Sequence, residues 1–123
     1  MEYQGFRDLI VYQKAYTASL EIFKITAKFP PEEKFSLVDQ IRRSSRSVAA
    51  NIAEAWSKRA YPKLFVSKLI EVSGEASETT VWLDMSKDLH YIPSVLYDSL
   101  IGQYDEISKM LTSMIHHPEK FCH

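Results

Sequence analysis

The chain has 123 residues, of which 46% are hydrophobic and 25% charged, and its formal net charge is −1. This length and balance are typical of one soluble globular domain, and three glycines and five prolines are too few for the turns of a many-stranded β fold. The single cysteine, Cys122, excludes an intrachain disulfide and favours a reducing cytoplasm. We see no signal peptide, and no apolar run approaches the roughly 20 residues that span a membrane.

Four amphipathic segments separated by prolines predict helices over residues 6–29, 36–59, 62–89 and 94–115, followed by a C-terminal tail at 116–123 that is expected to be frayed. In each segment apolar residues recur at spacings of three and four, which places them on one face of a helix. Helices of matched length with short connections predict a single-domain, all-α fold, an antiparallel up-down-up-down four-helix bundle.

The residues expected to face the core follow from these spacings. In the first segment they are Leu9, Tyr12, Tyr16, Leu20, Phe23 and Ala27, and in the second Leu37, Ile41, Ser44 or Ser45, Val48, Ile52 and Trp56. In the third they are Phe65, Leu69, Val72, Ala76, Thr79, Leu83 and Ser86, and in the fourth Leu96, Leu100, Tyr104, Ile107, Leu111 and Met114. Small residues at the centres of the second and third segments predict close packing of these two helices, within a subunit or between subunits.

The small net charge is the sum of two blocks of opposite sign. Residues 40–63 contain six basic residues and one acidic residue, which gives +5, whereas residues 64–106 contain two basic and eight acidic residues, which gives −6. Charge blocks of this kind are typical of solvated helix faces or of surfaces that bind a partner.

Three arginines dominate the basic block. Arg42, Arg43 and Arg46 lie three and four residues apart and predict a cationic ridge, extended at the end of the helix by Lys58 and Arg59. Arginine forks bind phosphate oxygens with two parallel hydrogen bonds, so this ridge is a candidate surface for nucleic acid or for a partner protein.

The acidic block offers an alternative. Glu71, Glu75 and Glu78 lie four and three residues apart on the next helix and form an anionic ridge of matching spacing. The second interpretation is that the arginines pair with these glutamates, which would then serve subunit assembly or a polar network. The sequence alone leaves both interpretations open.

The second helix also carries polar residues assigned to assembly. Asn51 and Glu54 lie about one helical turn apart, and Gln40 opens the same segment. Buried Asn and Glu side chains on a bundle helix hold its register or join a polar network across subunits. A catalytic role is disfavoured, because no histidine, cysteine or second carboxylate lies at a supporting spacing.

No catalytic, cofactor or metal site is predicted. His116, His117, Cys122 and His123 cluster in the C-terminal tail, without the spacing and rigid support of metal ligands. The Glu-x-x-His pairs of di-iron bundles, a P-loop, a glycine-rich dinucleotide turn and a nucleophile elbow are all missing from the sequence. We therefore expect a non-enzymatic protein.

The segment from Gln40 to Glu54, QIRRSSRSVAANIAE, resembles the signature of the small four-helix bundle proteins encoded within intervening sequences of bacterial 23S ribosomal RNA genes. Residues 6–15, 29–35 and 65–78 resemble the opening helix, first turn and third helix of that family, so the resemblance covers nearly the whole chain. The matching signature residues include Arg42, Arg43, Arg46, Asn51 and Glu54.

The sequence departs from the family pattern at two positions of the second helix. Ala49 stands where the family usually has proline, and Ala55 where glycine is usual. We expect these changes to affect the kink and the end of this helix but not the fold.

The resemblance implies a left-handed four-helix bundle that assembles into a ring, typically a homopentamer. The accessory proteins of diversity-generating retroelements are similar, and they bind nucleic acid and a reverse transcriptase through a basic surface of the pentamer. The resemblance does not decide whether the signature serves assembly or binding.

Two functions are consistent with these observations. The first is a nucleic-acid-associated protein, a ring that binds RNA, DNA or an RNA–protein complex through the basic second helix. The second is an oligomeric scaffold that recruits a protein partner such as a reverse transcriptase, with the arginines used for subunit assembly.

Overall fold

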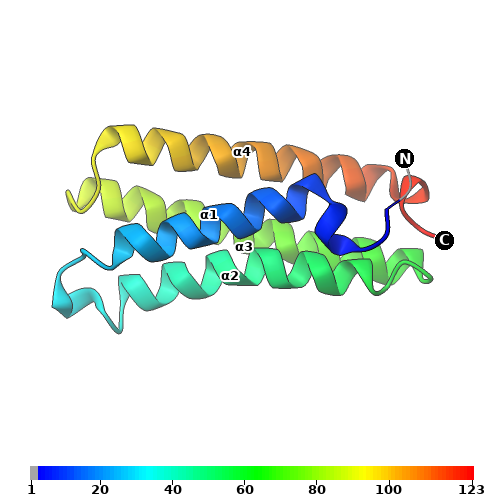
Figure 1. The fold of residues 1–123 in the computed structure, drawn as a ribbon, viewed down its shortest axis with the longest axis horizontal. Helices are drawn as coiled ribbons and strands as arrows, with labels where there is room; N and C mark the ends of the chain where they lie inside the picture. Colours follow the sequence, from blue (N-terminus) through cyan, green and yellow to red (C-terminus); the bar gives the residue numbers. More distant parts are fainter. Residues whose placement is uncertain (1–2) are drawn as a thin grey trace.

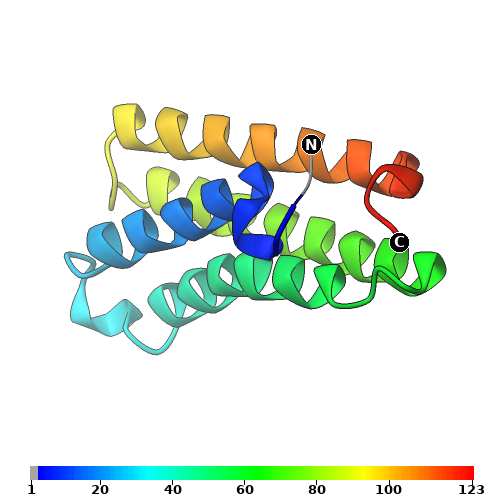
Figure 2. The ribbon, with the colours of Figure 1, turned by 45° about the vertical axis from the view of Figure 1, so that its right-hand side comes forward.

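The computed structural model describes residues 3–123 and shows four long helices joined by short turns (Figure 1). They are α1 (Ile10–Thr26), α2 (Leu37–Trp56), α3 (Pro62–Asp88) and α4 (Ser94–His116). Successive helices run in opposite directions (Figure 1, Figure 2), and the described chain begins and ends where α2 leads into α3 (Figure 1). This is the predicted all-α four-helix bundle. No helix within residues 3–123 is long and apolar enough to cross a membrane.

The first helix starts and ends differently from the prediction of residues 6–29. A short 3-10 helix covers Phe6–Asp8, and α1 begins only at Ile10. Leu9 interrupts the two because its backbone is extended (φ −71°, ψ 126°), and its side chain is buried. The other three helices begin and end within three residues of their predicted bounds.

Three of the four predicted core stripes are confirmed. Every predicted residue of the α2 and α3 stripes is buried, including both Ser44 and Ser45. In α4 the stripe from Leu100 to Met114 is buried and Leu96 is half-buried. Because these stripes follow the helical period closely, three core-facing surfaces could be assigned from spacing alone.

In the stripe predicted for the first helix, Leu9 is buried and Tyr12 is half-buried, but the assignment of Tyr16, Leu20, Phe23 and Ala27 to the core is wrong. The core-facing residues of α1 are Val11, Ala15, Ala18, Ile22 and Thr26, whereas Tyr16, Leu20 and Phe23 are exposed by 45–48%. Two stripes of period three to four overlap on this helix, and the one with the smaller side chains faces the bundle. The larger apolar side chains therefore lie on its outer surface, towards α2.

Close packing of α2 against α3, expected from their small residues, places two hydroxyl groups in the core. Thr79 of α3 donates a hydrogen bond to the Ser44 hydroxyl of α2 at 2.8 Å, and both residues are buried. The neighbouring Ser45 and Ala76 are completely buried. Small side chains let the two helices approach, and the hydrogen bond satisfies polar atoms that would otherwise be buried without partners.

The C-terminal segment is folded rather than frayed. Pro118–Lys120 forms a 3-10 helix after α4, and the Phe121 ring stacks with Tyr3 and Phe65, at centroid distances of 6.0 and 6.3 Å. Tyr3 also meets the Trp56 ring edge-on at 5.5 Å. The expectation of a frayed tail is wrong because Phe121 contributes an aromatic side chain to the end of the core.

The turn between α3 and α4 ends α3 with an uncommon backbone conformation. His90 has a positive φ of 64°. Its N–H donates to the Lys87 carbonyl at 2.9 Å, and the Tyr91 N–H donates to the Ser86 carbonyl at 2.8 Å. These two bonds form a Schellman motif, whose left-handed position is normally glycine.

Replacing Ala76 with leucine is expected to lower the free energy of unfolding by about 1–3 kcal/mol, because the added methylene groups overpack the contact between α2 and α3. Ser77→Leu is the matched control, since position 77 is exposed on the same helix, and it should change stability by less than about 0.5 kcal/mol. Urea unfolding measures both. Equal effects of the two variants would contradict close packing at position 76.

Replacing His90 with glycine is expected to raise the free energy of unfolding by about 1 kcal/mol, because glycine adopts the left-handed conformation without the clash of a Cβ atom. His90→Ala, which keeps the Cβ atom, should give no comparable gain. Thermal unfolding of the three proteins measures the difference. If His90→Ala raised the free energy of unfolding by the same amount, the imidazole of His90, and not its backbone conformation, would be what destabilises the wild-type protein.

Candidate nucleic-acid interface

Arg42 extends from α2 to the C-terminal end of α1. Its Nε donates a hydrogen bond to Thr26 Oγ1 at 2.9 Å, and one of its terminal nitrogens donates to the Phe23 carbonyl at 3.2 Å. The last turn of a helix has carbonyl groups without intrahelical partners and a partial negative charge, so it stabilises a cation. Arg42 is thereby held half-buried in one orientation.

Two guanidinium groups approach the Phe23 ring. The Arg42 Cζ atom is 4.3 Å from the ring centroid, and the Arg46 Cζ atom is 5.7 Å from it. Cations over an aromatic face are attracted by its negative quadrupole. Arg46 is exposed, and within residues 3–123 its side chain forms no hydrogen bond or ion pair. The donors of Arg46 therefore remain available to a ligand.

Arg43 lies on the opposite side of α2, near α3. Its side chain donates a hydrogen bond to Gln40 Oε1 at 3.2 Å. Burial, followed by the charge of Glu78, raises the pKa of Glu75, and the positive charge of Arg43 opposes that rise. Gln40, Arg43, Glu75 and Glu78 thus share the surface between α2 and α3.

The predicted continuation of the arginine ridge to Lys58 and Arg59 is not observed. The Arg59 guanidinium lies over the Trp56 ring, 3.8 Å from its centroid, and its Nε donates to the Trp56 carbonyl at 3.1 Å. Arg46 and Trp56 are ten residues apart on α2, or about 15 Å along its axis. Lys58 and Arg59 therefore belong to the end of the bundle that holds the termini.

The structure does not bring the basic residues into one ridge. Consecutive residues of a helix point about 100° apart, so Arg42 and Arg46 reach α1 while Arg43 lies beside α3. Within residues 3–123, the ion pairs join Lys14 to Glu106, Lys68 to Glu54 and Glu71, and His117 to Glu119. No arginine of α2 is paired with the acidic ridge in the described part of the chain, and pairing across subunits stays a prediction.

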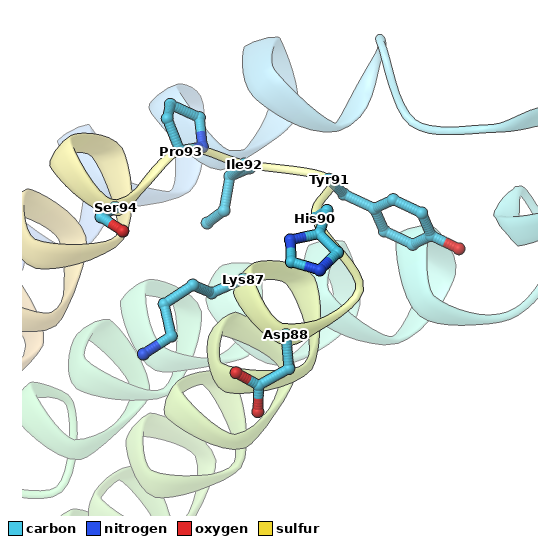
Figure 3. Close-up of a pocket in the computed structure, with 7 residues that line it drawn as sticks. All are labelled: Lys87, Asp88, His90, Tyr91, Ile92, Pro93 and Ser94. Atoms are coloured by element: carbon cyan, nitrogen blue, oxygen red, sulfur yellow. The ribbon is translucent and has the colours of Figure 1, made fainter.

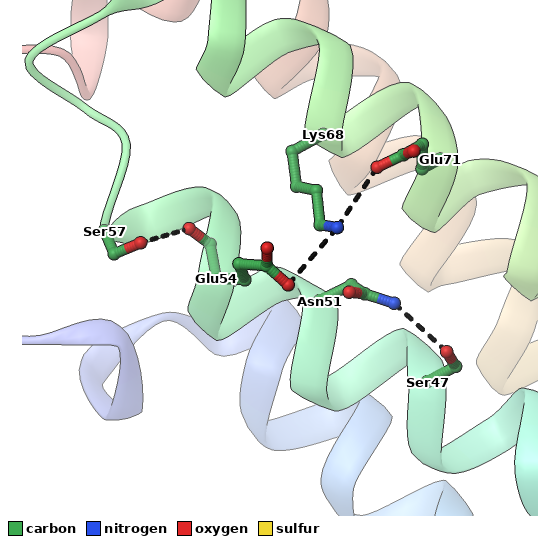
Figure 4. Close-up of polar contacts among 6 residues, drawn as sticks. All are labelled: Ser47, Asn51, Glu54, Ser57, Lys68 and Glu71. Carbon is green, nitrogen blue, oxygen red and sulfur yellow. Dashed lines mark hydrogen bonds and ion pairs between the residues drawn. The ribbon is translucent and has the colours of Figure 1, made fainter.

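Asn51 forms a polar contact within α2, and Glu54 forms one with α3 (Figure 4). Asn51 is half-buried and donates to Ser47 Oγ at 3.0 Å, while Glu54 is exposed, so the two are not the buried pair that was expected. Lys68 Nζ lies 3.2 Å from a carboxylate oxygen of Glu54 and 3.2 Å from one of Glu71. Hydrogen bonds to Glu71 and then to Glu54 raise the pKa of Lys68.

Sequence reasoning missed two residues of these arrangements. Lys68 bridges α2 and α3. The sequence contained a signal for this role, because Lys68 is one of two basic residues in the acidic block of residues 64–106 and lies three residues before Glu71. Phe23 is the ring on which Arg42 and Arg46 meet. It was assigned to the core because apolar periodicity does not indicate which of two overlapping stripes is buried.

The comparisons with known proteins agree with this architecture. Residues 7–113, which extend from the first 3-10 helix into α4, match the model of a family described as 23S rRNA-intervening sequence protein. The chain belongs to this family. A solved structure from Bacteroides thetaiotaomicron, described as a protein with unknown function from the S23 ribosomal protein family, is 32% identical with a TM-score of 0.79. The similarity covers 87% of this chain and 96% of that chain. No curated protein matches the chain.

This member of the 23S rRNA-intervening sequence protein family has a continuous α2. Ala49 and Ala55, the two departures from the family pattern, are both buried within it. Alanine keeps the backbone donor that proline lacks and restricts the chain more than glycine does. The helix therefore continues through both positions and ends at Trp56.

An open pocket of about 640 Å³ lies at the turn from α3 to α4, far along the bundle from the termini (Figure 1, Figure 3). Lys87, Asp88, His90 and Ser94 provide its polar side chains. Within residues 3–123, no group of three or more His, Cys, Asp or Glu side chains could hold a metal ion. The shape of this pocket follows from the Schellman turn, and the α1–α2 surface is the better candidate for binding.

Replacing Glu75 with glutamine is expected to raise the free energy of unfolding at neutral pH by less than about 1 kcal/mol. Burial and Glu78 raise the pKa of Glu75 above its ordinary value of 4.5, so ionisation costs more in the folded chain than in the unfolded chain. This free-energy cost of ionising Glu75 in the folded chain declines as the pH falls through the raised pKa, and it is absent below pH 4.5. Urea unfolding at several pH values should therefore show the gain in stability of Glu75→Gln at neutral pH and its decline as the pH falls.

Glu71→Gln serves as the control, because the Glu71 carboxylate pairs with Lys68 and its loss should give no gain at neutral pH. If Glu75→Gln instead lowers stability at neutral pH and dissociates an oligomer, Glu75 contacts a cation of a neighbouring subunit.

Proposed function

We propose that this protein is a non-enzymatic protein that binds RNA, alone or within an RNA–protein complex, as an oligomeric ring. The binding surface is the face of α1 and α2 around Arg42, Arg46 and Phe23. One observation carries the proposal: both guanidinium groups meet at an exposed aromatic ring, and neither is paired with a carboxylate within residues 3–123.

The geometry of the two arginines suits phosphate recognition. Arg42 is held by two hydrogen bonds to α1, so little side-chain entropy remains to be lost on binding. Arg46 is exposed and keeps its donors free, and Lys24 and Lys28 are exposed at the same end of α1. The held Arg42 and the exposed Arg46, Lys24 and Lys28 can together contact phosphate groups, and such contacts weaken as the salt concentration rises.

Assembly into a ring would strengthen this binding. A single face offers few cations, and each phosphate contact contributes little at physiological salt. A ring of identical subunits presents the same face several times, which raises the effective concentration of the second and later contacts. The homopentamer implied by the family resemblance would provide five such faces.

A second candidate function is an oligomeric scaffold in which the arginines connect subunits and the ring recruits a protein partner. Two observations favour it. Glu75 and Glu78 form no ion pair within residues 3–123, and Tyr16 and Leu20 present apolar area on α1. Aromatic and arginine side chains are also enriched at protein interfaces.

Replacing Arg46 with glutamate is expected to weaken binding of a fluorescein-labelled RNA hairpin at least tenfold, because the change removes a phosphate contact and adds repulsion. Arg59→Glu makes the same charge change at the other end of α2, where the guanidinium covers Trp56, and should weaken binding much less. Fluorescence anisotropy at about 50 and 200 mM salt measures affinity and its salt dependence.

Light scattering on the same samples separates the two functions. If Arg46→Glu keeps the wild-type mass and loses RNA, the arginine lines a binding surface. If the variant dissociates, the scaffold function is favoured. Salt-independent or absent binding of RNA by the intact wild-type oligomer would refute the RNA-binding function.

A further inference from the structure

A row of aromatic rings follows the outer surface of α1. We define the α1 aromatic row as Phe6, Tyr12, Tyr16 and Phe23. The ring centroids of Phe6 and Tyr12 are 4.9 Å apart, and those of Tyr12 and Tyr16 are 5.9 Å apart. Phe23 lies about two turns beyond Tyr16, with the exposed Leu20 between them. Tyr16 is 48% exposed and Phe23 is 45% exposed, whereas Phe6 and Tyr12 are half-buried against the core, so the row presents most of its ring surface to solvent at Tyr16 and Phe23.

Arginines stand at both ends of this row. The Arg7 guanidinium lies over the Phe6 ring, 4.5 Å from its centroid. At the other end, Arg42 and Arg46 lie over Phe23. The row of rings along this side of the bundle therefore has a cation at each end. Periodicity had assigned the rings of α1 to the core and the arginines of α2 to a separate ridge.

We infer that the α1 aromatic row binds unpaired nucleotides of RNA, with bases stacked on the rings and phosphates paired with the arginines. The inference rests on the proposed function and narrows its ligand to single-stranded RNA. In a duplex the faces of the bases are stacked on one another and only edges and backbone are accessible. An unpaired base offers its π face, which aromatic side chains bind irrespective of sequence.

The dimensions of the row agree with such a ligand. From Tyr12 to Phe23 the axis of α1 advances by about 16 Å, the length of four or five stacked nucleotides at about 3.4 Å each. The hydroxyls of Tyr12 and Tyr16 form no hydrogen bond within residues 3–123. Phenol groups so placed can donate to phosphate oxygens or to 2′-hydroxyl groups, while the guanidinium planes offer further stacking surface.

Charge favours RNA over a second copy of the chain as the occupant. If two copies met through this row about a two-fold axis, the same patch would face itself in the reverse direction. The Arg7 end of one copy would then approach the Arg42 and Arg46 end of the other, and like charges across an interface are repelled. A polyanion with exposed bases complements the cations and the rings together.

The test compares oligouridine of about 12 nucleotides with an RNA duplex of similar length. Wild-type protein is expected to bind the single strand at least fivefold more tightly in fluorescence anisotropy. Tyr16→Ala should weaken binding of the single strand by about fivefold or more and leave duplex binding unchanged. Tyr16→Phe keeps the ring and should retain most of the affinity. Tyr61→Ala removes an aromatic side chain that is 65% exposed elsewhere and should change neither affinity.

Three other outcomes would overturn the inference, and each of them indicates a different reason. If Arg46→Glu weakens binding of both probes but Tyr16→Ala weakens neither, the protein binds RNA through charge alone and the row takes no bases. If wild-type protein binds neither probe, the proposed function itself fails. If Tyr16→Ala dissociates the oligomer in light scattering while retaining its helical circular dichroism, the row is a contact between subunits.

Discussion

The contact between α2 and α3 determines where every charged residue of α2 points. Ser44 and Thr79 are hydrogen-bonded at 2.8 Å within it, and the small residues Ser45 and Ala76 beside them are completely buried. With this face of α2 held against α3, Arg42 and Arg46 must reach α1, and Arg43 must lie on the other side. One buried interface therefore divides a short run of basic sequence between two surfaces of different character.

Most of the fold could be predicted because three helices have a single apolar stripe each. For α2, α3 and α4, burial and the three-to-four spacing agree, so the core could be assigned without a structure. α1 has two stripes, and the chain buries Ala15 and Ala18 rather than Tyr16 and Leu20. Helix propensity and periodicity describe one helix at a time, so they do not indicate which of the two stripes packs against the other helices. Phe121 was missed for a related reason, since a short terminal segment has no periodicity to detect.

The candidate site could be predicted in its residues but not in its geometry. Arg42 and Arg46 were identified from sequence, yet both meet at Phe23, which is nineteen residues from Arg42 in the chain, and this meeting point depends on how α1 and α2 are oriented. The network of Lys68 with Glu54 and Glu71 likewise joins α2 and α3. No local sequence pattern predicts the contact of Lys68 with Glu54. The bundle, the arginines of α2 and the segment of residues 6–15 resemble the family, whereas Tyr16 and Phe23 lie outside the segments that carry this resemblance.

The aromatic cluster of Tyr3, Trp56, Phe65 and Phe121 holds the C-terminal segment at one end of the bundle, whereas Arg46 and Arg42 lie about 15 and 21 Å before Trp56 along the axis of α2. A fluorescent protein or an affinity handle joined to the C-terminus would therefore sit at the end of the bundle remote from that arginine pair. Immobilisation through the C-terminus would present the turn between α1 and α2 to the solution. The molecule can thus be labelled or anchored without covering Arg42 and Arg46.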